Sequence, residues 1–168
     1  MDSFFNESLG TLAKMSWNGF EHNVLYQNEG EETFVNVAWL MDVAHEYDSR
    51  SVLAEDFDAD GRPDILITER HWDFKTGLVL PHIRLLDNRL EPEGGWIGAH
   101  LRGATGRSPV GAVVTTRAGK RVWRHWVLTG DSLAAQHPFT AHFGFGKMEA
   151  VDSLEVRWPD GRVTRLVK

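Results

Sequence analysis

The chain has 168 residues, of which 42% are hydrophobic and 25% are charged, and its formal net charge is −6. This length allows one domain or two small ones with a buried core, and the composition is typical of a soluble globular protein. No run of eighteen apolar residues occurs, so membrane insertion is not expected. Cysteine is absent, which excludes disulfide bonds and thiolate metal sites.

The two halves of the chain differ in charge. Residues 1–90 carry 17 acidic and 7 basic side chains, a net charge of −10, whereas residues 91–168 carry 7 and 11, a net charge of +4. Pro92, Gly94 and Gly95 interrupt the pattern between the halves. We therefore expect a domain boundary near residues 91–95. An acidic half facing a basic one could also drive head-to-tail self-association.

Most of the chain reads as short strands. Residues 23–28 and 33–39 flank a turn-rich segment with Gly30 at the turn, which is typical of a β-hairpin. Turn signals recur at intervals of roughly 8 to 12 residues. Further strands are expected at residues 51–57, 64–70, 82–88, 96–103, 110–119, 120–130, 139–146, 152–159 and 161–167. This spacing predicts an all-β protein with sandwich-like sheet packing, and only residues 6–15 and 40–47 look helical.

The loop EDFDADGRPD, residues 55–64, concentrates five carboxylates between two expected strands. Carboxylates so close repel one another unless they are solvated or share a cation. Counted from the first aspartate of the loop, side-chain oxygens fall at positions 1, 3, 5 and 9, a glycine falls at position 6, and the carbonyl of position 7 would point inward. This donor set suits Ca²⁺ better than Mg²⁺. The expected ligands are Asp56, Asp58, Asp60, Asp64 and the carbonyl of Arg62.

The loop is not an EF-hand, because position 12 is Ile67 within an expected strand, where an EF-hand needs a bidentate glutamate. A solvated turn without metal is the alternative, since Asp and Gly favour turns. So many protein oxygens would leave few coordination positions for a substrate, so we expect a structural ion and no catalytic residues.

The segment DFDADGRPDILIT resembles the calcium loop of FG-GAP/VCBS repeats, whose pattern DxDxDGxxD precedes an apolar strand. Residues 23–38 and 48–57 resemble the lead-in of the same repeats. The resemblance implies Ca²⁺ at the five positions named above. It also implies a module that forms one blade of a β-propeller in that family.

Three later segments resemble, in order, the landmarks of the ASPIC/UnbV domain of the cartilage acidic protein-like family. They are GAHLRGATGRSPVGAVVTTRAGKRVWRHWV, HFGFG and SLEVRWPDGRVTRL. The resemblance implies an uncertain N-terminal segment at residues 1–21, an FG-GAP/VCBS-like calcium module at 22–90, and an ASPIC/UnbV-like β domain at 91–168. The expected fold is therefore a single propeller-blade-like module joined to or packed on a C-terminal β-sandwich-like domain.

A propeller needs several blades, typically 4 to 8, and this chain holds sequence for one clear calcium repeat. A lone blade exposes edge strands, which can pair with another chain. We therefore expect either a fragment of a longer protein or a subunit that completes its sheet by assembly.

Other candidate sites are weaker. Trp123 and Trp126 should face opposite sides of a strand, one in the core and one exposed, and exposed aromatics can stack on sugars, so carbohydrate is a further candidate partner. His125, His137 and His142 suggest a transition-metal or haem site, but no HExxH or CxxCH motif supports it. Ser132, His137 and Asp131 lack a nucleophile elbow, and we interpret them as a chance arrangement. The basic residues alternate along strands without a recognised nucleic-acid-binding module, so nucleic acid is not an expected partner.

The sequence predicts a non-catalytic, calcium-stabilised protein of adhesion, scaffolding or assembly, with a protein partner or self-association. An extracellular or periplasmic location fits, because millimolar external calcium fills sites of modest affinity. The N-terminus has no basic region or long apolar run, so we do not expect these residues to form a signal peptide. The alternative is an accessory protein or enzyme of a biosynthetic or electron-transfer system that uses the His and Trp residues of the C-terminal domain.

Overall fold

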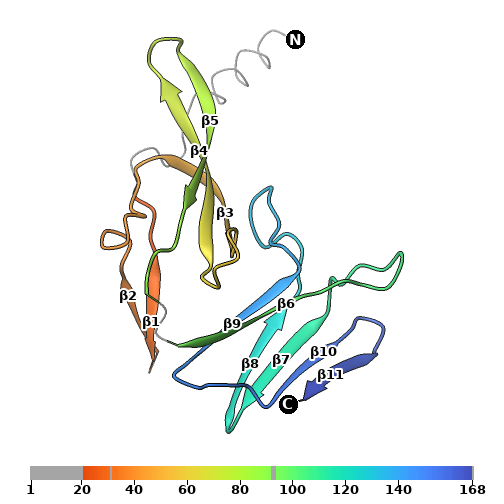
Figure 1. The fold of residues 1–168 in the computed structure, drawn as a ribbon. Coiled ribbons are helices and arrows are strands. Elements are labelled where there is room, and N and C mark those ends of the chain that lie inside the picture. The colour runs from red at the N-terminus through yellow and green to blue at the C-terminus, as the bar shows by residue number, and fades with distance from the viewer. Residues whose placement is uncertain (1–20, 31, 92–93, 168) are drawn as a thin grey trace. The chain divides into compact units, whose positions relative to one another are not determined.

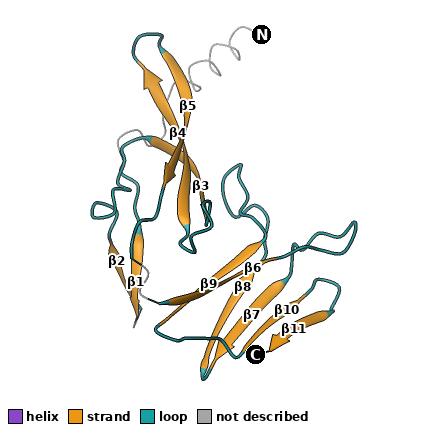
Figure 2. Cartoon of the chain, viewed as in Figure 1, coloured by secondary structure: helices purple, strands orange, loops and turns teal. Residues whose placement is uncertain are grey.

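The computed structural model describes residues 21–30, 32–91 and 94–167, and within them the chain is built from β-strands joined by loops (Figure 1). No helix occurs among these residues (Figure 2), and none is therefore long and apolar enough to cross a membrane. The all-β class expected from the sequence is confirmed for the described part of the chain.

The expected strands appear close to their predicted positions, because alternating, β-branched and aromatic segments are separated by glycine, proline and aspartate turns. Their bounds are β1 Tyr26–Gly30, β2 Thr33–Asn36, β3 Asp48–Glu55, β4 Asp64–Asp73, β5 Leu78–Leu86, β6 Gly95–His100, β7 Val113–Ala118, β8 Arg121–Trp126, β9 Thr140–Gly146, β10 Ser153–Arg157 and β11 Val163–Val167. The strands form four sheets, ordered β1-β2, β3-β4-β5, β6-β9 and β11-β10-β7-β8.

Contacts divide the chain into two compact units. Among the described residues, the first unit contains those from 21 to 51 and from 67 to 86, and the second contains those from 52 to 66 and from 87 to 167. The acidic loop therefore groups with the C-terminal strands, although it precedes β5 in sequence. The predicted domain boundary near residue 91 stays a prediction.

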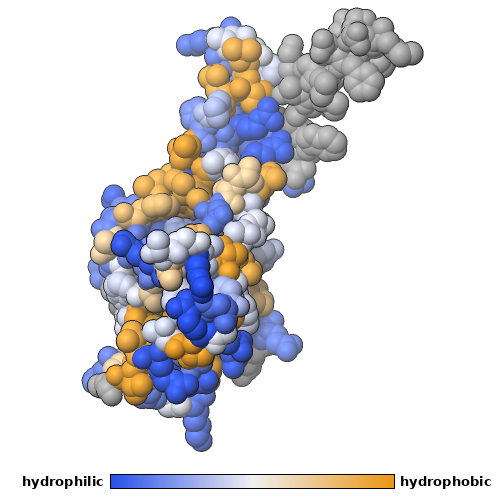
Figure 3. Space-filling model, turned by 90° about the vertical axis from the view of Figure 1, so that its right-hand side faces the viewer, coloured by the Kyte–Doolittle hydropathy of each residue, from blue (hydrophilic) through white to orange (hydrophobic). Residues whose placement is uncertain are grey.

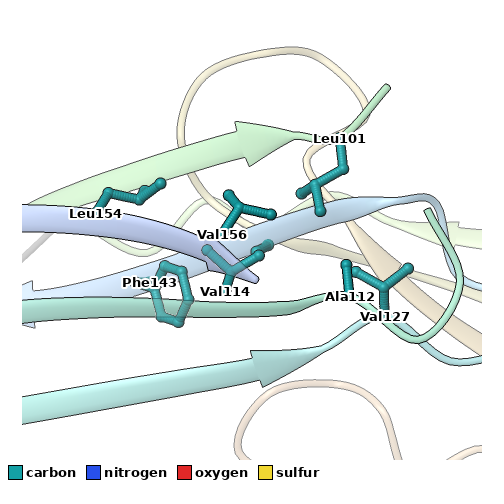
Figure 4. Packing of buried hydrophobic residues seen from close by; sticks show 8 residues of the cluster. Leu101, Ala112, Val114, Val127, Phe143, Leu154 and Val156 are labelled. Atoms are coloured by element: carbon teal, nitrogen blue, oxygen red, sulfur yellow. The ribbon is translucent and has the colours of Figure 1, made fainter. Parts of the chain in front are cut away.

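The second unit has a cluster of buried hydrophobic residues to which both sheet β11-β10-β7-β8 and sheet β6-β9 contribute (Figure 4). Val114 is paired with Val156 across β7 and β10, and both are buried. Phe143 of β9 belongs to the same cluster. The other buried members are Leu101, Ala112, Val127, Ala141 and Leu154. Trp123 packs against this cluster whereas Trp126 is 55% exposed, which confirms that the two tryptophans face opposite sides of β8.

The first unit buries much less. Its described hydrophobic core residues are Ala38, Val43 and Ile67. Every residue of β1 and β2 that the structure describes is exposed, and β5 is mostly exposed. The space-filling view shows apolar side chains, in orange, at the surface between hydrophilic ones (Figure 3). Sheets with so little buried apolar surface have little to stabilise them on their own.

The prediction of a helix at residues 40–47 is wrong. The segment makes a single turn in which the amides of Met41 and Val43 donate to the carbonyls of Val37 and Ala38 at 3.0 and 2.9 Å. Asp42 then takes a positive φ of 54°, and a left-handed residue cannot continue a right-handed helix. The other predicted helix, residues 6–15, lies outside the described residues.

Candidate metal site in the acidic loop

The acidic loop joins β3 to β4 (Figure 1), and several of its backbone amides donate hydrogen bonds to its own carboxylates. The two oxygens of Asp56 accept hydrogen bonds from the amides of Asp60 and Gly61 at 3.0 and 2.9 Å. Asp60 accepts from the amide of Arg62 at 2.8 Å. Gly61 has a φ of 90°, a conformation that side-chain-bearing residues rarely adopt. The sharp turn predicted at this glycine is confirmed.

This folding gathers three of the predicted ligands. One carboxylate oxygen from each of Asp56, Asp58 and Asp60 lies within 4.8 Å of the others, and no further group of three or more candidate ligands occurs among the described residues. Oxygens 2.3–2.6 Å from a common ion are separated by distances of this order. The donor set is carboxylate only, which is the chemistry that hard cations such as Ca²⁺ and Mg²⁺ prefer. The residues therefore fit a divalent cation.

Asp64 lies outside that group of three carboxylates and is only 3% exposed. Its two oxygens accept hydrogen bonds from the amides of Phe57, at 3.1 Å, and Asn88, at 2.8 Å. The Asn88 side chain in turn donates to the Pro63 carbonyl at 3.1 Å. Asp64 thus ties the end of the loop to the segment after β5. Its role as a fourth carboxylate ligand stays a prediction.

Arg62 is the basic residue of the loop. Its guanidinium forms an ion pair with Asp60 and donates from Nε to the carbonyl of Asn88 at 2.6 Å. A cation bound to the three carboxylates would share Asp60 with this guanidinium. Arg62 therefore offsets part of the negative charge of the loop whether or not a metal is bound.

Two residues of sheet β6-β9 hold the loop from outside. His142 donates from Nε2 to the carbonyl of Gly61 at 2.9 Å. Its ring stacks on Trp96, with centroids 5.2 Å apart and an angle of 11° between the planes. Trp96 also covers Gly61 so closely that a Cβ atom there would lie 2.2 Å from the indole. The loop therefore contacts β6 and β9, although these strands lie about 30 to 80 residues later in the sequence.

A shallow depression of about 270 Å³ lies beside this contact. It is lined on one side by Gly61 and Arg62 of the loop and on the other by Trp96 and His142. None of Asn88, Trp96 and His142 was predicted to contact this loop, and His142 was considered only for a transition-metal or haem site. Only Gly61 had a signal in the sequence, because glycine is common where another group must approach the backbone closely.

The other predicted clusters are only partly brought together. Nδ1 of His137 lies 2.9 Å from Oδ2 of Asp131, while the Ser132 hydroxyl accepts a hydrogen bond from the amide of Val52 at 3.1 Å. His125 is half-buried against Phe143. Burial lowers the pKa of His125 below its ordinary value, and the charge of His137 lowers it further. The described histidines form no group of three metal ligands.

A buried charge cluster in the first unit was missed by the sequence analysis. Glu69 on β4 is 1% exposed and accepts hydrogen bonds from Arg84 at 3.0 Å and His71 at 2.9 Å. His71 is stacked between Tyr47 and His82. Burial raises the pKa of Glu69, but the hydrogen bonds from Arg84 and His71 outweigh it and hold the pKa below its ordinary value. The cluster links β4 to β5 and satisfies a charge that would otherwise be costly to bury.

Comparison with known proteins identifies one family model that matches part of the chain. No curated protein matches the chain at a significant level. The family model described as ASPIC and UnbV matches residues 103–168, a range that begins in the loop after β6 and contains β7 to β11. The C-terminal region of this chain is thus similar to the ASPIC and UnbV family.

Proposed function

We propose that the chain is a non-catalytic module of assembly, scaffolding or adhesion whose acidic loop is stabilised by a bound Ca²⁺. The observation that supports a bound cation is the convergence of Asp56, Asp58 and Asp60 within 4.8 Å around the turn at Gly61. Three carboxylates at that spacing repel one another, and a divalent cation removes the repulsion. The resemblance of the loop to FG-GAP/VCBS repeats points to the same ion.

The proposed ion is structural. When bound, it supplies a positive charge that holds the loop closed, and the chain supplies the three converging carboxylates, with the Arg62 carbonyl and Asp64 as the further ligands. Because Trp96 and His142 contact Gly61, a closed loop is also held on sheet β6-β9. Ca²⁺ is favoured over Mg²⁺, since a flexible loop tolerates irregular coordination better than a strict octahedron. A location outside the cytoplasm would provide millimolar calcium.

The assembly role is supported by the first unit. In the described sheet β3-β4-β5 the outer strands are β3 and β5, and β5 exposes Leu78, Ile83 and Leu85 at 57%, 74% and 53%. Exposed apolar edge strands are surfaces on which other chains pair or pack.

The cation is tested by thermal unfolding of the purified chain with excess Ca²⁺ and with EGTA. A ligand at 100 times its Kd stabilises the folded state by about 2.7 kcal/mol, so Ca²⁺ should raise Tm by several degrees. Asp58→Asn should lose this shift, because it removes one converging carboxylate. Asp87→Asn is the matched control, since its charge change is the same and Asp87 pairs with exposed Arg89 outside the loop.

Equal Tm values in Ca²⁺ and EGTA for the wild-type chain would refute the calcium proposal. If the Ca²⁺-dependent shift in Tm persists in Asp58→Asn, the ion binds at a site other than this loop. Mg²⁺ at the same concentration measures the selectivity, and we expect a smaller shift than with Ca²⁺.

A further inference from the structure

Alternating arginines of the C-terminal region gather on one face of sheet β11-β10-β7-β8. The printed register places Arg165 of β11 opposite Glu155 of β10, and Glu155 opposite Thr115 of β7. Thr115 lies opposite Arg124 of β8. Residues directly opposite each other point to the same side of a sheet, so these four side chains form one row. The neighbouring residues Val114 and Val156 are buried, so the row faces away from the core.

Two flanking rows complete this surface, which we call the arginine face. One row consists of Val163, Arg157, Val113 and Trp126, and the other of Val167, Ser153, Arg117 and Val122. The face thus holds four exposed arginines, one glutamate and an apolar border that includes Trp126, at 55% exposure. Arginine and tryptophan are the residue types most enriched at the energetic centres of protein interfaces.

Most of the arginine charge is free for a partner. Arg165 donates from Nε to Glu155 at 3.0 Å. The guanidinium groups of Arg117, Arg124 and Arg157 have no hydrogen bond or ion pair within the described residues. The hydrogen bond from Arg165 lowers the pKa of Glu155, and the nearby charges of Arg117 and Arg157 lower it further. The face is therefore strongly positive, with a single compensating carboxylate.

The β1-β2 hairpin offers the complementary chemistry. Its turn carries exposed Glu29 and Glu32, and residues 26–36 contain no lysine or arginine. Tyr26 pairs with Asn36 and Asn28 pairs with Phe34, so Tyr26 and Phe34 share one side and are 59% and 58% exposed. A two-stranded hairpin is marginally stable alone in water. An acidic tip and an exposed aromatic side match a surface of arginines with an apolar border.

We propose that the arginine face binds the β1-β2 hairpin of a second copy of this chain, a contact that rests on the assembly role proposed above and identifies its surfaces. Four strands span about 14 Å between the outer backbones, which is wide enough to receive a hairpin of two strands. Glu29 and Glu32 pair with unpartnered arginines, and Tyr26 and Phe34 pack on Trp126 and the valines of the border. The two surfaces differ, so the contact is heterologous and forms head-to-tail chains or rings.

The test uses two charge-reversal variants of the full chain in sedimentation velocity at low salt. Arg124→Glu with Arg157→Glu reverses the face, and Glu29→Lys with Glu32→Lys reverses the hairpin. Wild-type chain should increase in mean mass with concentration and dissociate as salt is raised. Each variant alone should stay monomeric, because like charges then meet. An equimolar mixture should regain assembly, since each reversed surface meets an opposite partner.

The control for the face variant is Arg102→Glu with Lys147→Glu, which makes the same change in net charge as the face variant at two exposed positions outside the face and should assemble as the wild type does. Far-ultraviolet circular dichroism verifies that each variant folds. If the face variant fails to fold, Arg124→Gln with Arg157→Gln replaces it. The expected result for this substitute is weakened assembly. Assembly that survives both reversals, or a mixture that stays monomeric, overturns the proposed contact while wild-type assembly still supports the assembly role. A wild-type chain that stays monomeric at all concentrations overturns both, and its Ca²⁺ response reports separately on the cation.

Discussion

The two units of the chain differ in where their apolar side chains lie. In the second unit, β7, β9 and β10 direct theirs into one cluster in which Val114, Ala112 and Ala141 are completely buried. In the first unit, the hairpin and β5 leave large apolar side chains in solvent. Both units are built from β-strands. Alternating strands therefore become a stable domain only when a second sheet covers them.

The largest expected effect is a loss of stability when a buried side chain of the second unit is truncated. Phe143→Ala removes a side chain that is 5% exposed, and such substitutions cost about 3–5 kcal/mol. Phe34→Ala is the matched change in the first unit, where Phe34 is 58% exposed. At concentrations where the chain is monomeric, we expect it to change stability by less than about 0.5 kcal/mol. Urea unfolding measures both, and equal costs would contradict the contrast between the units.

An intermediate effect is expected at the loop. Gly61→Ala and Gly161→Ala both place a side chain at a positive φ, 90° and 84°, which costs about 1–2 kcal/mol. Only Gly61 would also drive a Cβ atom into Trp96, because nothing lies within 4 Å of the Cβ position at Gly161. Overpacking adds about 1–3 kcal/mol. Gly61→Ala should therefore unfold at lower urea and lose the Ca²⁺-dependent stabilisation, which Gly161→Ala retains. Equal behaviour would mean that the Trp96 contact does not constrain the loop.

The smallest expected effect is a pH dependence within the second unit. Burial lowers the pKa of His125, so between its folded pKa and about 6.5 the unfolded chain binds a proton that the folded chain does not. Stability should therefore fall as pH decreases below about 6.5, with a slope of at most about 1.4 kcal/mol per pH unit from this residue. His125→Asn should flatten the curve, and His100→Asn, at an exposed position, should not. Parallel curves for all three proteins would contradict a lowered pKa of the half-buried His125.

The sequence predicts local structure well and long-range neighbours poorly. Short-range chemistry was sufficient for the hairpin at Gly30, the strands on both sides of the acidic loop, and the turn at Gly61. The helix predicted at residues 40–47 failed because Asp42 adopts a left-handed conformation, which its apolar periodicity does not reveal. The three aspartates within five residues were brought together by the loop itself, whereas Asp64 faces Asn88 and Phe57.

The long-range contacts that the sequence did not predict depend on which strands become neighbours. The alternation of arginines along β7, β8, β10 and β11 suggested dispersed charge. The order β11-β10-β7-β8 places those arginines on a single surface. Similarly, His142 and Gly61 are 81 residues apart, so no local pattern could associate them. Pairing order is set by the whole fold, which a single sequence leaves open.

The most direct test of the cation site is terbium luminescence, because Tb³⁺ binds to oxygen sites that suit Ca²⁺ and is excited by a nearby tryptophan. Trp96 covers Gly61 within the loop, so we expect emission on tryptophan excitation that saturates with Tb³⁺ and is displaced by Ca²⁺ more readily than by Mg²⁺. Trp96→Phe should reduce the emission, and Asp58→Asn with Asp60→Asn should abolish saturable binding. A wild-type chain that gives no saturable emission, or a double variant that binds Tb³⁺ as tightly as the wild type, would contradict a cation site in this loop.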